Sequence, residues 1–371
     1  MNRRRPKRYL ISLTLLATLT GCTESTKPAG GGLELLWRSP AANVGQDWAN
    51  GTPAVDGGRV FVQEGHSLVA IDAASGARLW SRRIRIAASP PPTTLLANAG
   101  VVYVSETDSL MAVEASTGRT IWSVHPDSQA VTEPALDNSG FYTGQRGLAV
   151  VYALERATGA IRWKTNVVVG SAFAAHVRGV AVAGDTVYAA VEKYLDRNGA
   201  AAKGVLVALD RMTGTELWRY ETPGERDFFY SAPLVAGSQV IVNNFYRGTL
   251  ISIDTRTHLE LWTTIVGGTG RGIIDGQQIF TAGFDTKARA LDLRTGVVKW
   301  TGSTGSSAFG LGVCGSNLFV SAFDLRRYDG ATGAISGNAD RGVYGAFTSH
   351  ITSDGTRAFA VSWNGVFAFA C

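Results

Sequence analysis

A stretch of residues that ends in tryptophan recurs along this chain and restricts its fold more than any other feature. The complete copy runs from Leu206 to Trp218, with the sequence LVALDRMTGTELW. Alternating apolar and small residues at its start are typical of a half-buried strand. Asp210 and Thr213 can bond the backbone of the turn that follows, and Gly214 supplies the positive φ of a bulged hairpin. The stretch therefore predicts two antiparallel strands joined by a tight turn.

Five other copies of the stretch end in tryptophan, and a seventh copy, Leu325 to Gly337, keeps the turn but has glycine where the ring is expected. The tryptophans of these copies lie 38 to 55 residues apart. Each interval between copies holds two further β-like runs around a polar turn. We label these two strands A and B, and the two strands of each copy C and D. Four short strands in each period of about 40 residues are typical of a β-propeller blade.

The two ends of the chain each supply part of one more blade. Leu33 to Trp37 (LELLW) resembles a D strand with no C strand before it, whereas residues 347–371 supply three runs that resemble A, B and C strands. Joining the two pieces closes the ring and removes its exposed sheet edges. The predicted fold is thus all-β: an eight-bladed β-propeller over residues 33–371, closed by an N-terminal strand that completes the C-terminal blade.

The repeat accounts for seven of the nine tryptophans of the chain. Rings placed once per blade most simply pack against the neighbouring blade, so we predict a structural role for them. This tryptophan ladder consists of Trp37, Trp80, Trp122, Trp163, Trp218, Trp262 and Trp300.

The N-terminus has the three parts of a secretory signal: a basic start, the apolar run Leu10 to Leu19, and small residues before a cleavage site. Its ending, Leu19-Thr20-Gly21-Cys22, resembles the lipobox of bacterial lipoproteins. The resemblance implies that residues 1–21 are removed and that Cys22 is lipidated, which anchors the protein to a membrane. Thr23 stands where an inner-membrane lipoprotein would carry aspartate, which favours the outer membrane. Residues 22–32 are rich in polar residues, proline and glycine, and predict a flexible tether.

The charge of the exported chain is close to zero. The formal net charge of the whole sequence is +5, but the signal carries five basic residues and no acidic ones. Nucleic-acid binding needs a clustered positive face, so we expect no nucleic-acid partner.

Cys314 and Cys371 are the other two cysteines of the chain. An exported protein meets an oxidising compartment, in which a pair of cysteines can form a disulfide. The sequence leaves open whether these two are bonded or remain free thiols.

The pattern Ala-x-Asp-x-x-Thr-Gly-x-x-x-Trp, complete from Ala208 to Trp218, resembles the tryptophan-docking motif of the pyrroloquinoline-quinone-type repeat. Other copies depart from it, with Glu114 and Glu155 in place of aspartate and His258 in place of glycine. Two groups share this repeat: quinoprotein dehydrogenases and the BamB-like outer-membrane lipoproteins, which assist β-barrel assembly. The length, lipobox, eight blades and composite closing blade are similar to the second group.

Signs of catalysis are few in this sequence. The quinoprotein enzymes hold their quinone and Ca²⁺ with a vicinal cysteine pair, a stacked tryptophan and oxygen ligands, and this chain has no Cys-Cys pair. Its five histidines stand singly, without the spacing of zinc ligands, and no nucleophile elbow or phosphate loop is present. We therefore predict no catalytic residue, no metal site and no cofactor.

A partner surface is expected on one face of the ring. The C–D turns are uniform and read as structural, whereas the D–A and B–C loops of the opposite face are variable and carry arginine and aromatic residues, which are typical of interface hot spots. The candidate partner-binding residues are Tyr194, Asp196, Arg197, Arg226, Asp227, Phe228, Phe229, Tyr230, Phe245, Tyr246, Arg247 and Arg271.

From these features we predict a monomeric, lipid-anchored outer-membrane lipoprotein that faces the periplasm and acts as a non-enzymatic scaffold. The resemblance implies an envelope protein as partner, with the β-barrel assembly machinery as the candidate. The alternatives are a quinoprotein dehydrogenase or its degenerate relative, and a propeller that binds a glycan or a peptide.

Overall fold

The computed structural model describes residues 31–40, 51–85, 95–106, 109–125, 132–145, 147, 149–168, 172–268, 270 and 272–371. The predicted signal, Cys22 and the tether as far as residue 30 lie outside the described residues. At Gly31 the backbone already contacts the ring, because its carbonyl oxygen accepts a hydrogen bond of 3.2 Å from the N–H of Asn338.

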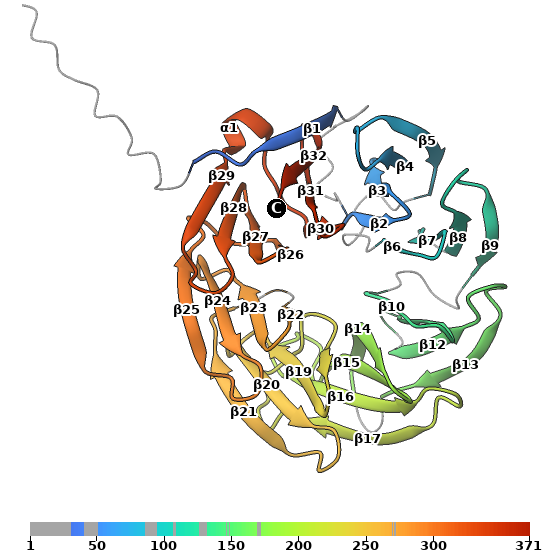
Figure 1. Ribbon diagram of the computed structural model, residues 1–371. Helices are drawn as coiled ribbons and strands as arrows, with labels where there is room; N and C mark the ends of the chain where they lie inside the picture. The colour runs from blue at the N-terminus through green and yellow to red at the C-terminus, as the bar shows by residue number, and fades with distance from the viewer. Residues whose placement is uncertain are drawn as a thin grey trace, which may run out of the picture.

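The described residues form eight four-stranded antiparallel sheets, arranged as blades around a central axis (Figure 1). In seven blades the strands follow one another in chain order from the axis outward. Blade 1 contains β2 (Ala54–Asp56), β3 (Arg59–Glu64), β4 (Ser67–Asp72) and β5 (Arg78–Arg83). Blade 2 contains β6 (Leu96–Asn98), β7 (Val101–Ser105), β8 (Leu110–Glu114) and β9 (Thr120–Val124). Blade 3 contains β10 (Ala135–Leu136), β11 (Phe141–Gly144), β12 (Val150–Leu154) and β13 (Ile161–Asn166).

Blade 4 contains β14 (Ala174–Ala183), β15 (Thr186–Tyr194) and β16 (Ala202–Asp210), which are the longest described strands, and β17 (Glu216–Glu221). Blade 5 contains β18 (Leu234–Ala236), β19 (Gln239–Asn244), β20 (Thr249–Asp254) and β21 (Glu260–Ile265). Blade 6 contains β22 (Ile273–Asp275), β23 (Gln278–Ala282), β24 (Lys287–Asp292) and β25 (Val298–Ser303). Blade 7 contains β26 (Gly310–Cys314), β27 (Asn317–Ala322), β28 (Asp324–Asp329) and β29 (Ile335–Ala339).

Blade 8 is the composite blade, and it confirms the predicted closure. Its strands are β30 (Thr352–Ser353), β31 (Arg357–Ser362), β32 (Gly365–Ala370) and, as the outer strand, the N-terminal β1 (Leu35–Pro40). β1 pairs antiparallel with β32, with Trp37 opposite Ala368. One short helix, α1 (Arg341–Tyr344), lies before this blade. In the described part of the chain no helix has the length and apolar character that a membrane crossing requires.

The C–D turn of blade 4 forms because Asp210 bonds the backbone that follows it. Its Oδ1 atom accepts from the N–H of Met212 at 3.0 Å, the N–H of Thr213 at 2.7 Å and the Thr213 hydroxyl at 2.8 Å. The bonds from Thr213 stabilise the charged carboxylate and lower the pKa of Asp210. Gly214 has φ of 72°, as a left-handed turn position requires.

Each ladder tryptophan lies between its own blade and the turn of the next. The Trp163 ring packs on the Cα of Gly214, where an added Cβ would lie 2.6 Å from the indole. The Trp163 Nε1–H donates to the carbonyl oxygen of Arg211 at 3.0 Å. Trp37, Trp80, Trp122 and Trp300 donate in the same way to the residue that follows the acidic position of the next turn. The motif thus requires glycine for two reasons: the turn needs a positive φ, and the tryptophan ring packs too close for a Cβ atom.

The turn of blade 5 keeps this shape although His258 replaces glycine. His258 adopts φ of 63°, and its N–H still donates to the carbonyl oxygen of Asp254 at 2.8 Å. Its imidazole stacks on Trp218 with ring centroids 4.6 Å apart. The turn of blade 5 therefore has the same conformation as the other C–D turns, although a positive φ is unfavourable for a residue with a side chain.

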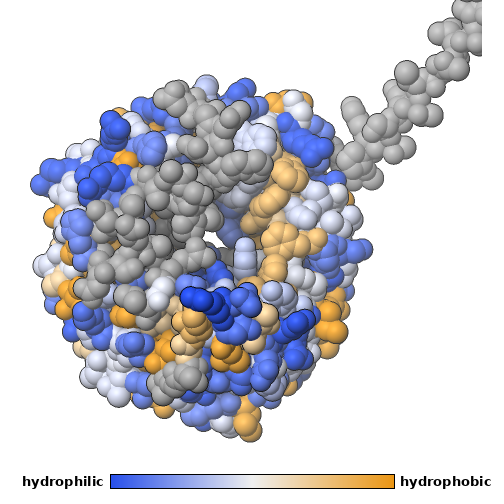
Figure 2. All heavy atoms as spheres, turned by 180° about the vertical axis from the view of Figure 1, so that it is seen from behind, coloured by the Kyte–Doolittle hydropathy of each residue, from blue (hydrophilic) through white to orange (hydrophobic). Residues whose placement is uncertain are grey.

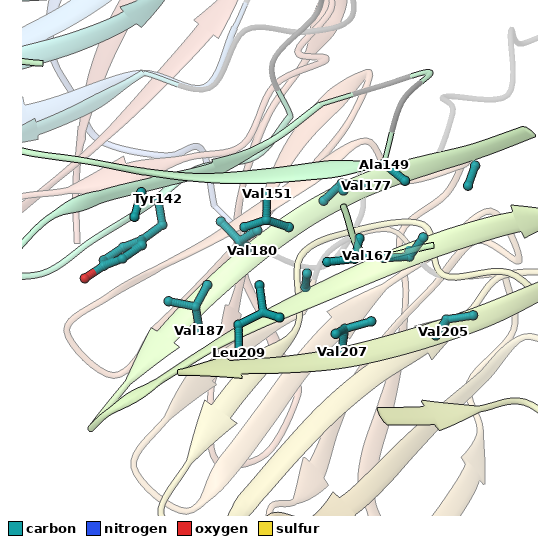
Figure 3. Close-up of a cluster of buried hydrophobic side chains, with 14 of the residues drawn as sticks. Tyr142, Ala149, Val151, Val167, Val177, Val180, Val187, Val205, Val207 and Leu209 are labelled. Carbon is teal, nitrogen blue, oxygen red and sulfur yellow. The ribbon is translucent and has the colours of Figure 1, made fainter. Parts of the chain in front are cut away.

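The buried apolar side chains of the described residues form eight clusters, one for each pair of neighbouring blades. Figure 3 shows the cluster between blades 3 and 4, in which Tyr142 and Val151 of blade 3 face Val180, Val187 and Leu209 of blade 4. In the described part of the chain the apolar core is thus divided among the interfaces between blades. Stability therefore comes from neighbour contacts that must be completed around the ring.

Candidate functional site

The long strands of blade 4 build one side of the candidate site. The first half of β14 alternates, so that Ala175 and Val177 are buried in the interface between blades while His176 and Arg178 face the other way. A bulge between Val177 and Gly179 breaks the pairing with β15 at Arg178. The interval between Trp163 and Trp218, 55 residues, is the longest between ladder tryptophans of the repeat copies. Much of the extra length extends strands β14 to β16, which leaves residues 195–201 as the B–C loop.

The D–A loop from blade 4 to blade 5, residues 222–233, is fixed to both blades. Ala202 at the start of β16 donates its N–H to the carbonyl oxygen of Glu225 at 2.8 Å and accepts from the N–H of Asp227 at 2.9 Å. Phe229 forms an isolated bridge with Asn244 at the end of β19. The loop is therefore a preformed part of the surface.

Side chains of this loop alternate between the interior and the surface, and this corrects two of the predicted partner residues. Phe229 is fully buried in the core cluster between blades 4 and 5. Asp227 is also buried, and its carboxylate accepts from Arg247 Nε at 2.6 Å and from the N–H of Gly224 at 3.1 Å. Neither side chain is accessible to a partner, because one completes the core and the other holds the loop. Arg247 is exposed but serves as the counter-ion of Asp227.

Phe228 and Tyr230 point outward and join an aromatic group with the B–C loop of blade 5. Phe245 stacks on Phe228 at 5.4 Å and on Tyr230 at 4.8 Å between ring centroids. Tyr246 meets Phe228 edge-on at 4.9 Å and is 62% exposed. The aromatic group thus has an inner part that supports it and an outer part that remains available for contact.

Arg178 connects blade 4 to this aromatic group. Its guanidinium lies 5.8 Å from the Phe228 ring centroid and 5.9 Å from that of Tyr230, within range of cation–π attraction. It forms an ion pair with Glu192, whose side chain is almost fully buried. The Nε atom of Arg178 is buried and has no hydrogen-bond partner in the described residues. Burial, and then the hydrogen bond to Glu192, raise the pKa of Tyr194 on the same wall.

These residues surround a pocket of about 520 Å³ at the loop ends of blades 4 and 5. Six of the predicted partner residues line it: Tyr194, Asp196, Arg197, Phe228, Tyr230 and Tyr246. Four residues outside the predicted set also line it: Phe173, His176, Arg178 and Glu192. Of the remaining predicted residues, Phe245 packs behind the wall, Arg226 is exposed on the loop, and Arg271 lies outside the described residues.

Asp196 shapes the B–C loop of blade 4. Its carboxylate accepts from the N–H groups of Asn198, Ala200 and Ala201, each at 3.0 Å. The carboxylate is therefore engaged by the loop backbone. Arg197 and Asn198 remain exposed at the pocket rim.

Other parts of the predicted site set lie away from this pocket. Cys314 in β26 and the terminal Cys371 are joined as a disulfide, with their Cα atoms 5.3 Å apart. Among the described residues, no group of three or more His, Cys, Asp or Glu side chains is placed to hold a metal ion.

Figure 2 shows the ring from behind, with hydrophilic and hydrophobic residues interspersed around a small central opening.

Comparison with known proteins identifies a family and a fold. The family described as "Outer membrane protein assembly factor BamB" matches residues 27–148 and 147–311. The structure is similar to that of BamB from Moraxella catarrhalis, with a TM-score of 0.65 and 16% identity, over 91% of this chain and 98% of that one. Quinohemoprotein alcohol dehydrogenase from Comamonas testosteroni gives a TM-score of 0.70 at 15% identity, over 91% of this chain and 76% of that one. No curated protein matches the sequence.

Proposed function

We propose that this chain, which belongs to the family of outer membrane protein assembly factor BamB, is a lipid-anchored scaffold. It binds an envelope protein through its D–A and B–C loops. The finer proposal is that the partner belongs to the machinery that assembles outer-membrane β-barrels. The lipobox ending at Cys22 supports the anchor, and the family supports an outer-membrane location on the periplasmic side.

The observation that carries the proposal is the surface of blades 4 and 5. Here arginine and aromatic side chains stand exposed on loops whose backbones are fixed by hydrogen bonds to the blades. A preformed surface loses little conformational entropy on binding. Arg197 and Arg226 are exposed and form no ion pair within the described residues, so each can meet an acidic group of a partner.

Charge reversal at these two arginines tests the proposal. We expect the double variant Arg197→Glu/Arg226→Glu to lose at least about tenfold in partner affinity, because each reversal replaces attraction by repulsion. The measurement is partner retention on the purified, tagged lipoprotein in solubilised envelope membranes. Arg247 is left intact, since its loss would leave Asp227 buried without its counter-ion.

The matched control is Arg119→Glu/Arg294→Glu, two exposed arginines on the C–D turns of the opposite face. This control should retain its partners. Equal retention by both double variants would argue against the proposed face.

A second candidate function, quinoprotein dehydrogenase, is favoured by the structural likeness to the quinohemoprotein alcohol dehydrogenase. The residues present do not fit the quinone and Ca²⁺ of such enzymes. The chain has no vicinal cysteines, and Cys314 and Cys371 are bonded to each other across blades 7 and 8. Titration of the purified protein with quinone and Ca²⁺ separates the two functions, since saturable binding with dye-linked alcohol oxidation would favour the enzyme.

A further inference from the structure

We propose that the pocket between the loop ends of blades 4 and 5 is a binding site for a neutral oligosaccharide. The pocket lies within the loop surface proposed for the protein partner and shares Arg197, Tyr230 and Tyr246 with it, but sugar binding does not require that partner.

The charges that line the pocket cancel. Arg178 is paired with Glu192, and the carboxylate of Asp196 is engaged by three backbone N–H groups. Arg197 at the rim balances the formal charge of Asp196. A pocket of this kind selects neither a strong anion nor a strong cation, because burying an unmatched ligand charge here would have no compensation. The ligand that fits has no net charge.

The walls are aromatic and partly exposed. Phe173 is 59% exposed, Tyr246 62% and Tyr230 42%, although all three line one pocket. Aromatic faces carry partial negative charge and attract the weakly positive C–H groups of an apolar surface. A pyranose ring presents such C–H groups on its faces and hydroxyl groups around its edge.

Polar groups that can meet those hydroxyls stand between the rings. The hydroxyls of Tyr230 and Tyr246 and the side-chain amide of Asn198 belong to residues that line the pocket. The buried Nε–H of Arg178 is unpaired within the described residues. A buried donor without a partner is unfavourable, so a ligand hydroxyl that accepts from it would gain affinity. Neutral donors and acceptors between aromatic faces match the hydroxyl groups and C–H faces of a sugar ring.

The size and rigidity of the pocket agree with this ligand class. Its volume of about 520 Å³ lies within the range of about 300–1,000 Å³ for sites that hold a small molecule. One inserted side chain would leave most of it empty. The aromatic walls are held in place by ring stacking and by the bridge of Phe229 to Asn244, so the site is preformed.

Binding of defined sugars to the full-length protein in detergent tests the proposal. The probes are chitotriose and maltotriose as neutral oligosaccharides, with sialyllactose as a charged comparison, measured by calorimetry and by saturation-transfer NMR. We expect saturable binding of at least one neutral probe and weaker binding of the charged one. Phe173→Ala and Tyr246→Ala should each weaken binding roughly tenfold or more, since each removes an exposed aromatic face.

The matched control is Leu259→Ala, which removes an apolar side chain that is 68% exposed on the opposite face. It should leave sugar binding unchanged. The proposal is overturned if no neutral probe binds at millimolar concentration to the folded protein, or if Tyr246→Ala binds as tightly as the wild type. It is also overturned if an aromatic peptide binds in a manner that depends on Phe173 and Tyr246 while neither neutral sugar binds.

Discussion

Replacing Trp300 with alanine is expected to lower the free energy of unfolding by about 3–5 kcal/mol, the usual cost of removing a buried tryptophan. The ring is 9% exposed and belongs to the core cluster between blades 6 and 7. Its Nε1–H donates to the carbonyl oxygen of Gly330 at 2.9 Å, and its face packs on Gly333, where an added Cβ would lie 2.5 Å away. The substitution therefore removes apolar contact and leaves a carbonyl oxygen without its donor.

Urea denaturation followed by circular dichroism measures this loss. The control is Trp363→Ala, because Trp363 lies outside the ladder and is 40% exposed. If the two variants unfold at the same urea concentration, the ladder does not hold the blades together as described.

Removal of the disulfide is expected to destabilise the closed ring by about 4 kcal/mol. Cys314 and Cys371 lie 57 residues apart in the sequence, so the bond closes a long loop and restricts the unfolded chain. It also ties the last residue of the composite blade to β26 of blade 7, next to the seam where β1 enters. Cys314→Ala/Cys371→Ala should therefore lower the midpoint of thermal unfolding.

Reductant supplies the internal control for this effect. It should lower the midpoint of the wild-type protein and leave that of the double variant unchanged. Mass spectrometry after alkylation of the native protein tests the bond itself. Two alkylated thiols at Cys314 and Cys371 would contradict it.

The fold was predictable from the sequence because its determinants are local and repeated. Asp210, Gly214 and Trp218 each have a role within one turn or across one interface, and the same residue types recur at the same spacing. The closing strand was predictable for a different reason. Leu33 to Trp37 resembles a D strand that lacks its own C strand, and the structure pairs β1 with β32.

The site was only partly predictable, because its residues come together through contacts between blades. Arg178 stands in a strand of small and apolar residues, and no local pattern links it to Glu192 or to the rings of Phe228 and Tyr230. Its position follows from the bulge between Val177 and Gly179, which leaves Arg178 without a partner in β15 and which the sequence alone does not reveal.

One signal in the sequence could have improved the prediction. Residues 227–230 alternate in burial as a strand does, so Asp227 and Phe229 face inward while Phe228 and Tyr230 face outward. Treating this segment as an extended strand rather than as a loop would have removed the two buried residues from the partner set. His176 and Arg178 share the same two-residue period on β14 and could have been recognised as one face.

Co-purification of partners with the native protein from envelope membranes tests the central claim most directly. The account predicts that outer-membrane barrel-assembly proteins are recovered with the wild-type protein and are lost with Arg197→Glu/Arg226→Glu, while Arg119→Glu/Arg294→Glu retains them. Recovery of the wild-type protein without any envelope partner, or equal recovery of partners with both double variants, would contradict it.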